Sequence, residues 1–122
     1  MALMSKRLLR ELGIYNSYDI AKLAHSKLFL SYANDQSRGG KGIQWQVYGV
    51  GFKTAPDAPW YDHGMKTFVM YSPKEKEDVL QAAKAWCLAE YGILEWEKDV
   101  FECWHPVGTI EAAIKAKNDS KL

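Results

Sequence analysis

The sequence predicts a small α+β domain, with a mainly antiparallel sheet of three to four strands packed by a central helix over about 73–91. One observation is the alternation of apolar and polar side chains that begins at Ile43, which is the period of a half-buried strand. Another is the capped, amphipathic helix that follows Ser72. A length of 122 residues suits one domain with its own core. We therefore expect a single domain over 1–122, with a helical part at 1–33, a flexible glycine-rich loop at 34–42 and a sheet-and-helix core at 43–117.

Two helices are expected in the N-terminal part. Residues 5–12 combine a serine that can cap a helix, a leucine stripe and a glycine stop. A second helix should begin near Asn16 or Ser17, because either side chain can accept a hydrogen bond from the first turn. Apolar residues then recur at helical spacing as far as Leu28, so this helix is expected to continue to about Ala33.

The next segments are expected to form strands. Residues 43–52 start with the alternating run Ile-Gln-Trp-Gln-Val, which Gly49 and Gly51 then interrupt. Glycine inside a strand indicates a bulge or a close approach by another group. A loop that contains two prolines should cover 53–64, and residues 65–71 are the next expected strand.

The helix over 73–91 has the strongest local signals. Ser72 can cap it, and Glu75 can complete a capping box. Pro73 suits the first helical position, and Gly92 should end the helix. Its expected apolar face consists of Val79, Leu80, Ala83, Trp86 and Cys87.

The C-terminal part is expected to add short elements. Residues 93–97 and 100–104 form two short strands or one bent strand in this interpretation. Pro106 should end that segment, and Thr109 can cap a last short helix that runs to about Lys117.

Charge and cysteine content narrow the class of protein. The net charge is +1, which does not by itself imply a polyanionic partner. Residues 1–42 have seven basic and three acidic side chains (+4), and residues 43–122 have nine and twelve (−3). These parts could dock on one another, pair head to tail between subunits, or simply be solvated. The two cysteines form no disulfide framework, and no secretory signal or apolar membrane segment is present, so we expect a reduced, cytoplasmic protein that does not bind membranes.

No motif predicts a catalytic residue, a metal site or a cofactor. The loop Arg38-Gly-Gly-Lys41-Gly could contact an anion or a nucleic acid, but it lacks the GK[ST] ending of a phosphate-binding loop. Cysteines and histidines such as Cys103 and His105 lack the spacing of a structural zinc site. A nucleophilic cysteine with a histidine base has equally little support.

Aromatic side chains are the most unusual feature, with five Trp, seven Tyr and four Phe. Several must be core residues, but those of one strand fall on different faces, and others lie in a proline-containing loop. Exposed aromatic residues favour interfaces because they offer large contact area at low entropic cost. The expected interface or binding residues are Trp45, Tyr48, Phe52, Trp60, Tyr61 and His63.

Three functions follow as hypotheses. The first is a small non-catalytic interaction protein that binds itself, as a homo-oligomer, or another protein, in the manner of the accessory proteins of phages and mobile elements. The second is a nucleic-acid-binding protein that uses the basic N-terminal third. The third is a small-ligand binder or an enzyme with a pocket near Trp60, Asp62, His63 and His105.

Overall fold

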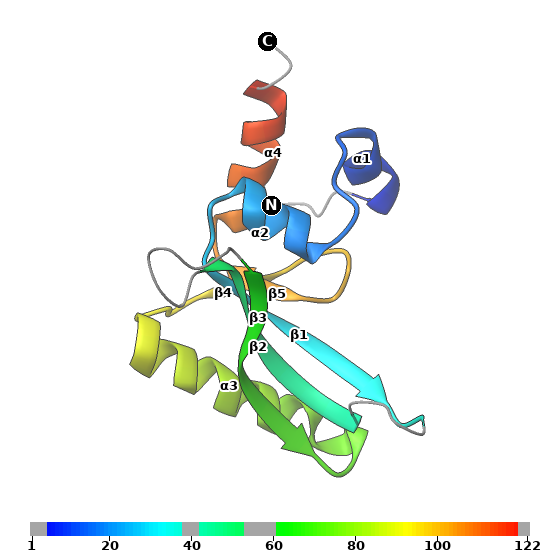
Figure 1. The fold of residues 1–122 in the computed structure, drawn as a ribbon, viewed down its shortest axis with the longest axis vertical. Coiled ribbons are helices and arrows are strands. Elements are labelled where there is room, and N and C mark those ends of the chain that lie inside the picture. Colours follow the sequence, from blue (N-terminus) through cyan, green and yellow to red (C-terminus); the bar gives the residue numbers. More distant parts are fainter. Residues whose placement is uncertain (1–4, 38–41, 53–60, 120–122) are drawn as a thin grey trace.

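The computed structural model describes residues 5–37, 42–52 and 61–119, with the backbone alone at 50–52 and 61–65. It confirms the α+β class (Figure 1). The elements are α1 (Lys6–Glu11), α2 (Ser17–Leu23), β1 (Leu28–Asp35), β2 (Gly42–Phe52), β3 (Tyr61–Met70), a 3₁₀ turn η1 (Pro73–Glu75), α3 (Lys76–Tyr91), β4 (Trp96–Lys98), β5 (Trp104–Pro106) and α4 (Thr109–Asp119).

The sheet has five strands among the described residues, in the order β3-β2-β1-β5-β4, and all neighbours are antiparallel. Three to four strands were expected, and the additional strand is β1, whose apolar residues had the spacing of a helix. Strands β3, β2 and β1 form a long meander, whereas β4 and β5 form a short hairpin beside β1 (Figure 1).

The expected helix from 16 or 17 to about 33 was therefore wrong in its second half. Asn16 does cap α2, since its side chain accepts a hydrogen bond from the Asp19 amide at 2.8 Å. The helix ends because His25 adopts a left-handed conformation, with φ of +56°. The amides of His25 and Ser26 then bond to the carbonyls of Lys22 and Ala21, which is a Schellman motif. The chain leaves it extended, so the apolar residues after it alternate between two sheet faces.

Several other boundaries differ from expectation. The central loop is shorter at both ends, because β1 continues to Asp35 and β2 begins at Gly42. The backbone of β3 begins at Tyr61 rather than at residue 65.

Pro106 ends β5, as expected. The C-terminal strands lie later than expected, since β4 is Trp96–Lys98 instead of 93–97 and β5 is Trp104–Pro106 instead of 100–104. The reason is that the Asp99 carboxylate accepts the amides of Phe101 and Cys103 and holds the residues between the two strands in a turn.

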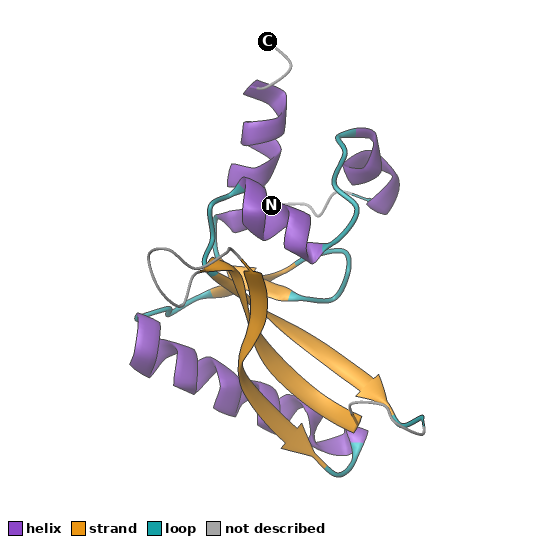
Figure 2. Cartoon of the chain, viewed as in Figure 1, coloured by secondary structure: helices purple, strands orange, loops and turns teal. Residues whose placement is uncertain are grey.

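Helix α3 covers one face of the long meander, as expected (Figure 2). Ser72 and Glu75 form the predicted capping box, and Gly92 ends the helix with φ of +71°. The core between helix and sheet includes buried Leu28, Leu30, Ile43, Trp45, Val47, Met70, Leu80, Ala83 and Cys87, with Val79 and Trp86 partly buried.

A second, smaller core lies at one end of the sheet, where α1, α2 and α4 gather (Figure 1). Its buried members are Leu9, Ile14, Ile20, Ile110 and Ala113. Within the described ranges, no helix has the length and apolar character needed to cross a membrane.

Candidate functional site

A buried polar cluster joins the two cores. Ser17 is the first residue of α2, Asp99 follows β4, and His105 is the central residue of β5. The Ser17 hydroxyl and His105 Nε2 each lie 2.6 Å from Asp99 Oδ2. All three residues are at most 5% exposed. This is the densest set of hydrogen-bonding side chains in the described part of the chain.

Asp99 is also the centre of the β4–β5 turn. Its Oδ1 accepts hydrogen bonds from the amides of Phe101 at 2.8 Å and Cys103 at 3.0 Å. Burial by itself would raise the pKa of Asp99, but the hydrogen bonds from His105, Ser17 and the Cys103 amide outweigh it and lower the pKa. The carboxylate is therefore ionised at neutral pH and accepts a hydrogen bond that His105 Nε2–H donates.

The cluster contains the residue types of a hydrolytic triad in an arrangement that does not match one. In a triad the imidazole lies between hydroxyl and carboxylate, whereas here Asp99 lies between Ser17 and His105. His105 Nδ1 is buried without a hydrogen-bond partner, and the His105 ring packs 5.4 Å from that of Phe29. The three side chains are almost wholly buried, so we interpret the cluster as a structural link between the helices and the β4–β5 hairpin.

The cysteines lie in similarly protected places. Burial raises the pKa of Cys87 to about 11, and burial is also the main cause that raises the pKa of Cys103. Both thiols are therefore poor nucleophiles at neutral pH. Among the described residues, no group of three or more His, Cys, Asp or Glu side chains is arranged to hold a metal ion.

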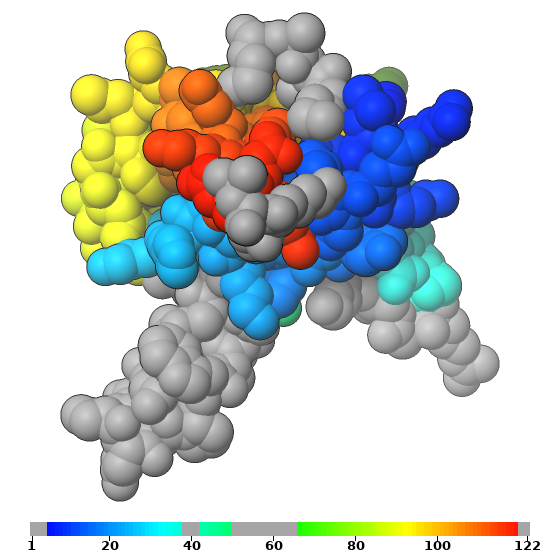
Figure 3. Space-filling view, turned by 90° about the horizontal axis from the view of Figure 1, so that it is seen from above, coloured from blue at the N-terminus to red at the C-terminus, as the bar shows by residue number. Residues whose placement is uncertain are grey.

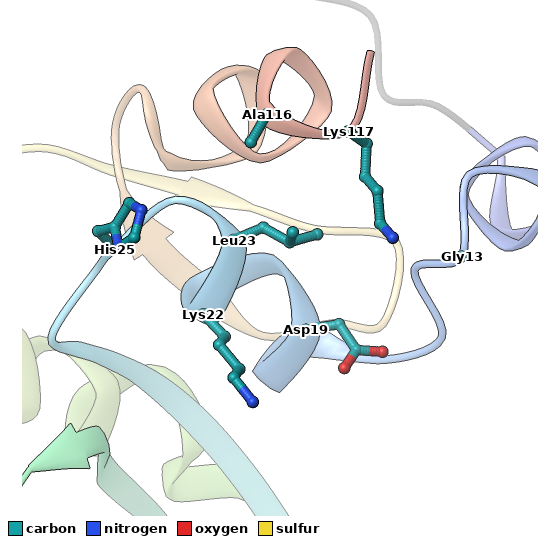
Figure 4. A pocket seen from close by; sticks show the side chains of 7 residues that line it. All are labelled: Gly13, Asp19, Lys22, Leu23, His25, Ala116 and Lys117. Atoms are coloured by element: carbon teal, nitrogen blue, oxygen red, sulfur yellow. The ribbon is translucent and has the colours of Figure 1, made fainter. Parts of the chain in front are cut away.

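A shallow hollow of about 550 Å³ opens between α2 and α4 (Figure 4). Its charged side chains are Lys22, Lys117 and Asp19, with His25 at one edge. Both lysines lie in the last turn of their helices, where they offset the negative helix ends. Asp19 faces the same space while accepting a hydrogen bond from the Tyr15 amide at 2.9 Å. Asp19 offsets one of the two lysines and the negative helix ends oppose the other, so the hollow has no strongly positive character that would define an anion site.

The structure corrects the expected position of Trp45. This side chain is 1% exposed in the main core, and its indole N–H donates to the Lys76 carbonyl at 2.9 Å. Tyr48 is half-buried, with its ring 5.3 Å from that of Phe29. The structure does not describe the side chains of the other residues expected at a binding site or pocket, which are Arg38, Lys41, Phe52, Trp60, Tyr61, Asp62 and His63.

His105 also differs from expectation, because it is fully buried and cannot line an open pocket. The basic residues of the N-terminal third are interspersed with acids: Glu11 and Asp19 lie on α1 and α2, and Glu111 and Asp119 lie on α4, which packs against α2. The described part of this region is thus of mixed charge.

A different surface was not predicted from the sequence. Leu88, Tyr91, Leu94 and Val107, which we call the apolar corner, are 45%, 43%, 78% and 56% exposed. They belong to the end of α3 and to the segments 93–95 and 106–107, which the hydrogen bond from the Val107 amide to the Glu95 carbonyl joins at 3.1 Å. A hollow of about 360 Å³, lined by Ile93, Leu94, Glu95, Pro106 and Val107, opens at this corner.

The pattern that could have revealed the corner is weak. Leu88 and Tyr91 lie one helical turn apart outside the expected apolar face of α3. Leu94 and Val107 come together only through the β4–β5 pairing. No protein-family model, curated protein or solved structure matches the chain, so a functional assignment depends on the surface itself.

Proposed function

We propose that this chain is a protein-interaction module and that the apolar corner is its docking surface. The observation that supports the proposal is the concentration of exposed apolar side chains there. The described residues include eight large apolar side chains that are exposed, and four of them belong to the end of α3 and to the segments on either side of the β4–β5 hairpin. Leu94 and Val107 line one hollow there. Single exposed apolar residues are ordinary on protein surfaces, whereas a group of them marks an interaction site.

Leu94 is the expected anchor of this surface. At 78% exposure it is the most exposed member of the corner, and burying a leucine side chain fully contributes about 1.5–3 kcal/mol. The hollow beside it can receive an apolar side chain of the partner. An anchor next to a hollow is typical of the centre of an interface.

Charge at the rim of the corner defines the partner further. Glu95 lines the hollow at the corner and is exposed. Two lysines lie over the Trp104 ring, with Lys84 Nζ at 4.0 Å and Lys98 Nζ at 6.0 Å from its centre. The carboxylate of Glu95 at the hollow favours a partner segment that places a positive charge beside its apolar side chain.

A peptide titration followed by NMR tests this proposal. We expect a helical leucine–lysine peptide to shift the amide signals of Leu88, Leu94 and Val107, and the matching leucine–glutamate peptide to shift them at least tenfold more weakly. Leu94→Ser should weaken binding of the lysine peptide. Val69→Ser is the matched control, because Val69 is 67% exposed on β3, away from the corner. Equal shifts with both peptides, or equal losses in both variants, would refute the proposal.

A further inference from the structure

We infer that the partner segment binds at the apolar corner as an extended strand, which adds to the free edge of the sheet at β4 and places a basic residue beside Glu95. This inference rests on the proposed function and names the backbone form of the segment that the same surface binds. It begins from the position of β4 in the sheet. In the strand order β3-β2-β1-β5-β4, β4 is the last strand, so no strand of the described ranges pairs with its outer side.

The hydrogen bonds of the β4–β5 hairpin show which backbone groups of β4 point outward. The Val107 amide donates to the Glu95 carbonyl at 3.1 Å, and the Asp99 amide donates to the Cys103 carbonyl at 2.9 Å. In an antiparallel ladder, hydrogen-bonded pairs alternate with pairs whose amides and carbonyls point away from the partner strand. The even-numbered residues between Glu95 and Asp99 therefore direct their backbone groups away from β5.

These residues are Trp96 and Lys98. In the ladder, Trp96 lies opposite Pro106 and Lys98 lies opposite Trp104. The same alternation directs the backbone of Trp104 away from β4, and Trp104 does pair on that side with Leu30 of β1. The amides and carbonyls of Trp96 and Lys98 have no backbone partner in the described part of the chain. They are therefore free to pair with an extended backbone.

The free edge is continuous with the apolar corner. Leu94 lies two residues before Trp96 in the same segment, and it lines the hollow together with Glu95 and Val107. Viewed from above, the end of α3 and the segment after it (yellow) form one side of the molecular surface (Figure 3). Strand β4 has only three residues, and an edge strand that short is a weak template for pairing by itself. The side chains of the corner must therefore contribute much of the affinity.

Alternation along the edge also defines the side chains of the added strand. Glu95 and Trp96 are consecutive, so their side chains point to opposite faces of the sheet. Glu95 is exposed, whereas Trp96 is partly buried against the main core. Because residues opposite one another on adjacent strands share a face, a basic residue beside Glu95 and an apolar residue beside Trp96 are consecutive in the partner. The backbone groups of a helix are already bonded to one another, so a helix would contact the corner through side chains alone.

Hydrogen exchange followed by NMR tests this inference on the intact protein. The probe is an extended peptide of alternating leucine and lysine, and its comparison is the helical leucine–lysine peptide of the same composition. We expect the extended peptide to bind about tenfold more tightly. At saturation it should slow exchange of the Trp96 and Lys98 amides by about tenfold or more. The Glu97 amide already faces β5, and β3 is the other edge of the sheet, so neither the Glu97 amide nor those of β3 should change.

Removal of single amides from either side of the interface is a second test. N-methylation of alternate residues blocks the amides on one side of an extended peptide, so one alternating set should weaken binding about tenfold and the other set should leave it nearly unchanged. On the protein, Lys98→Pro removes an outward amide, which an edge strand tolerates, and should weaken binding of the extended peptide. Lys98→Ala is the matched control, because it shortens the same side chain and keeps the amide. If Lys98→Pro fails to fold, the methylated peptides still decide.

The outcomes separate this inference from the proposed function. If the two peptides bind equally, if both methylated sets weaken binding equally, or if the protected amides belong to β3, the inference is wrong. If the helical peptide alone shifts the signals of Leu94 and Val107, the corner is a docking surface but its partner does not add as a strand. If neither peptide shifts these signals, the proposed function is wrong and the inference fails with it.

Discussion

Replacement of Asp99 is the most direct test of the structural role assigned to the buried cluster. The carboxylate accepts four hydrogen bonds, from the side chains of Ser17 and His105 and from the amides of Phe101 and Cys103. Asp99→Ala removes all four acceptor contacts at once. The two side-chain donors then remain in the interior, where water does not replace the lost acceptor.

The expected cost of Asp99→Ala follows from these donors. An unsatisfied buried polar group costs about 1–3 kcal/mol, and the Ser17 hydroxyl can turn away while the two amides are only partly buried. We therefore expect a loss of about 3 kcal/mol in the free energy of unfolding, mainly from the His105 donor, out of the roughly 5–15 kcal/mol usual for a domain. The melting temperature should fall by about 12 °C.

Asp99→Asn should cost less, about 2 kcal/mol. The amide oxygen can keep the two backbone hydrogen bonds, and the amide nitrogen can face Ser17 and His105. His105 must then carry its proton on Nδ1, which is buried and has no hydrogen-bond partner. The comparison of the two variants therefore separates loss of the turn contacts from loss of the contacts to Ser17 and His105.

The pH dependence provides an independent measurement of the same site. The pKa of Asp99 is lowered in the folded protein, so between its folded and unfolded pKa values the folded state binds fewer protons. Its contribution to stability is complete above the unfolded pKa of about 3.9 and is lost as pH falls through the folded pKa. The wild-type advantage over Asp99→Asn should therefore shrink below about pH 4.

Urea unfolding at pH 7 and at intervals down to pH 3, followed by circular dichroism, measures both effects. A loss below about 1 kcal/mol in Asp99→Ala would show that the donors find other partners. A difference between the wild-type protein and Asp99→Asn that stays constant from pH 7 to pH 3 would contradict the lowered pKa of the carboxyl.

Three further predictions concern local structure. His25→Gly should stabilise the protein by about 0.5–1 kcal/mol in thermal melts, because His25 is exposed and has a φ of +56°, which glycine adopts without strain. Destabilisation would mean that the imidazole makes a stabilising contact. Ser72→Ala should lower the free energy of unfolding by about 1 kcal/mol in urea, since the Ser72 side chain accepts a hydrogen bond from the Lys74 amide at 3.2 Å. An unchanged urea midpoint would show that the capping box does not stabilise the helix. Cys87 is fully buried and has a pKa raised to about 11. It should therefore react with a thiol reagent at pH 8 only as fast as the protein unfolds. A labelling rate that urea does not increase would contradict the position of Cys87 in the core.

Local signals predicted the elements in which cap and periodicity agree. The helix after Ser72 has a capping box, a proline at the first position and a glycine stop, and the structure contains all of them. The segment 28–33 lacked such signals and was assigned to a helix by spacing alone. This segment is a strand because His25 adopts a left-handed conformation and ends α2 before it, and no local rule favours histidine over glycine at that position. Burial of alternate residues against α3 then outweighs the helical spacing.

The candidate sites were less predictable because they are made of residues far apart in the chain. Ser17 and Asp99 are 82 positions apart, so their contact exists only once the sheet and the helices have packed together. Trp45 was expected at an interface, yet it alternates in phase with Val47 and therefore faces α3. Periodicity gives the face of a strand, but it does not say which face another element covers.

The fold places the positive and negative excesses of the sequence on different elements. Part of the positive excess of the N-terminal third lies on α1, and part of the negative excess of the remainder lies at the end of α3. The two cores carry these surfaces on opposite sides of the protein, which excludes their docking within one molecule. Elsewhere the two parts of the chain do pack together, because α2 contacts α4. For the charges on α1 and at the end of α3, solvation and pairing between subunits are the two interpretations that this arrangement allows.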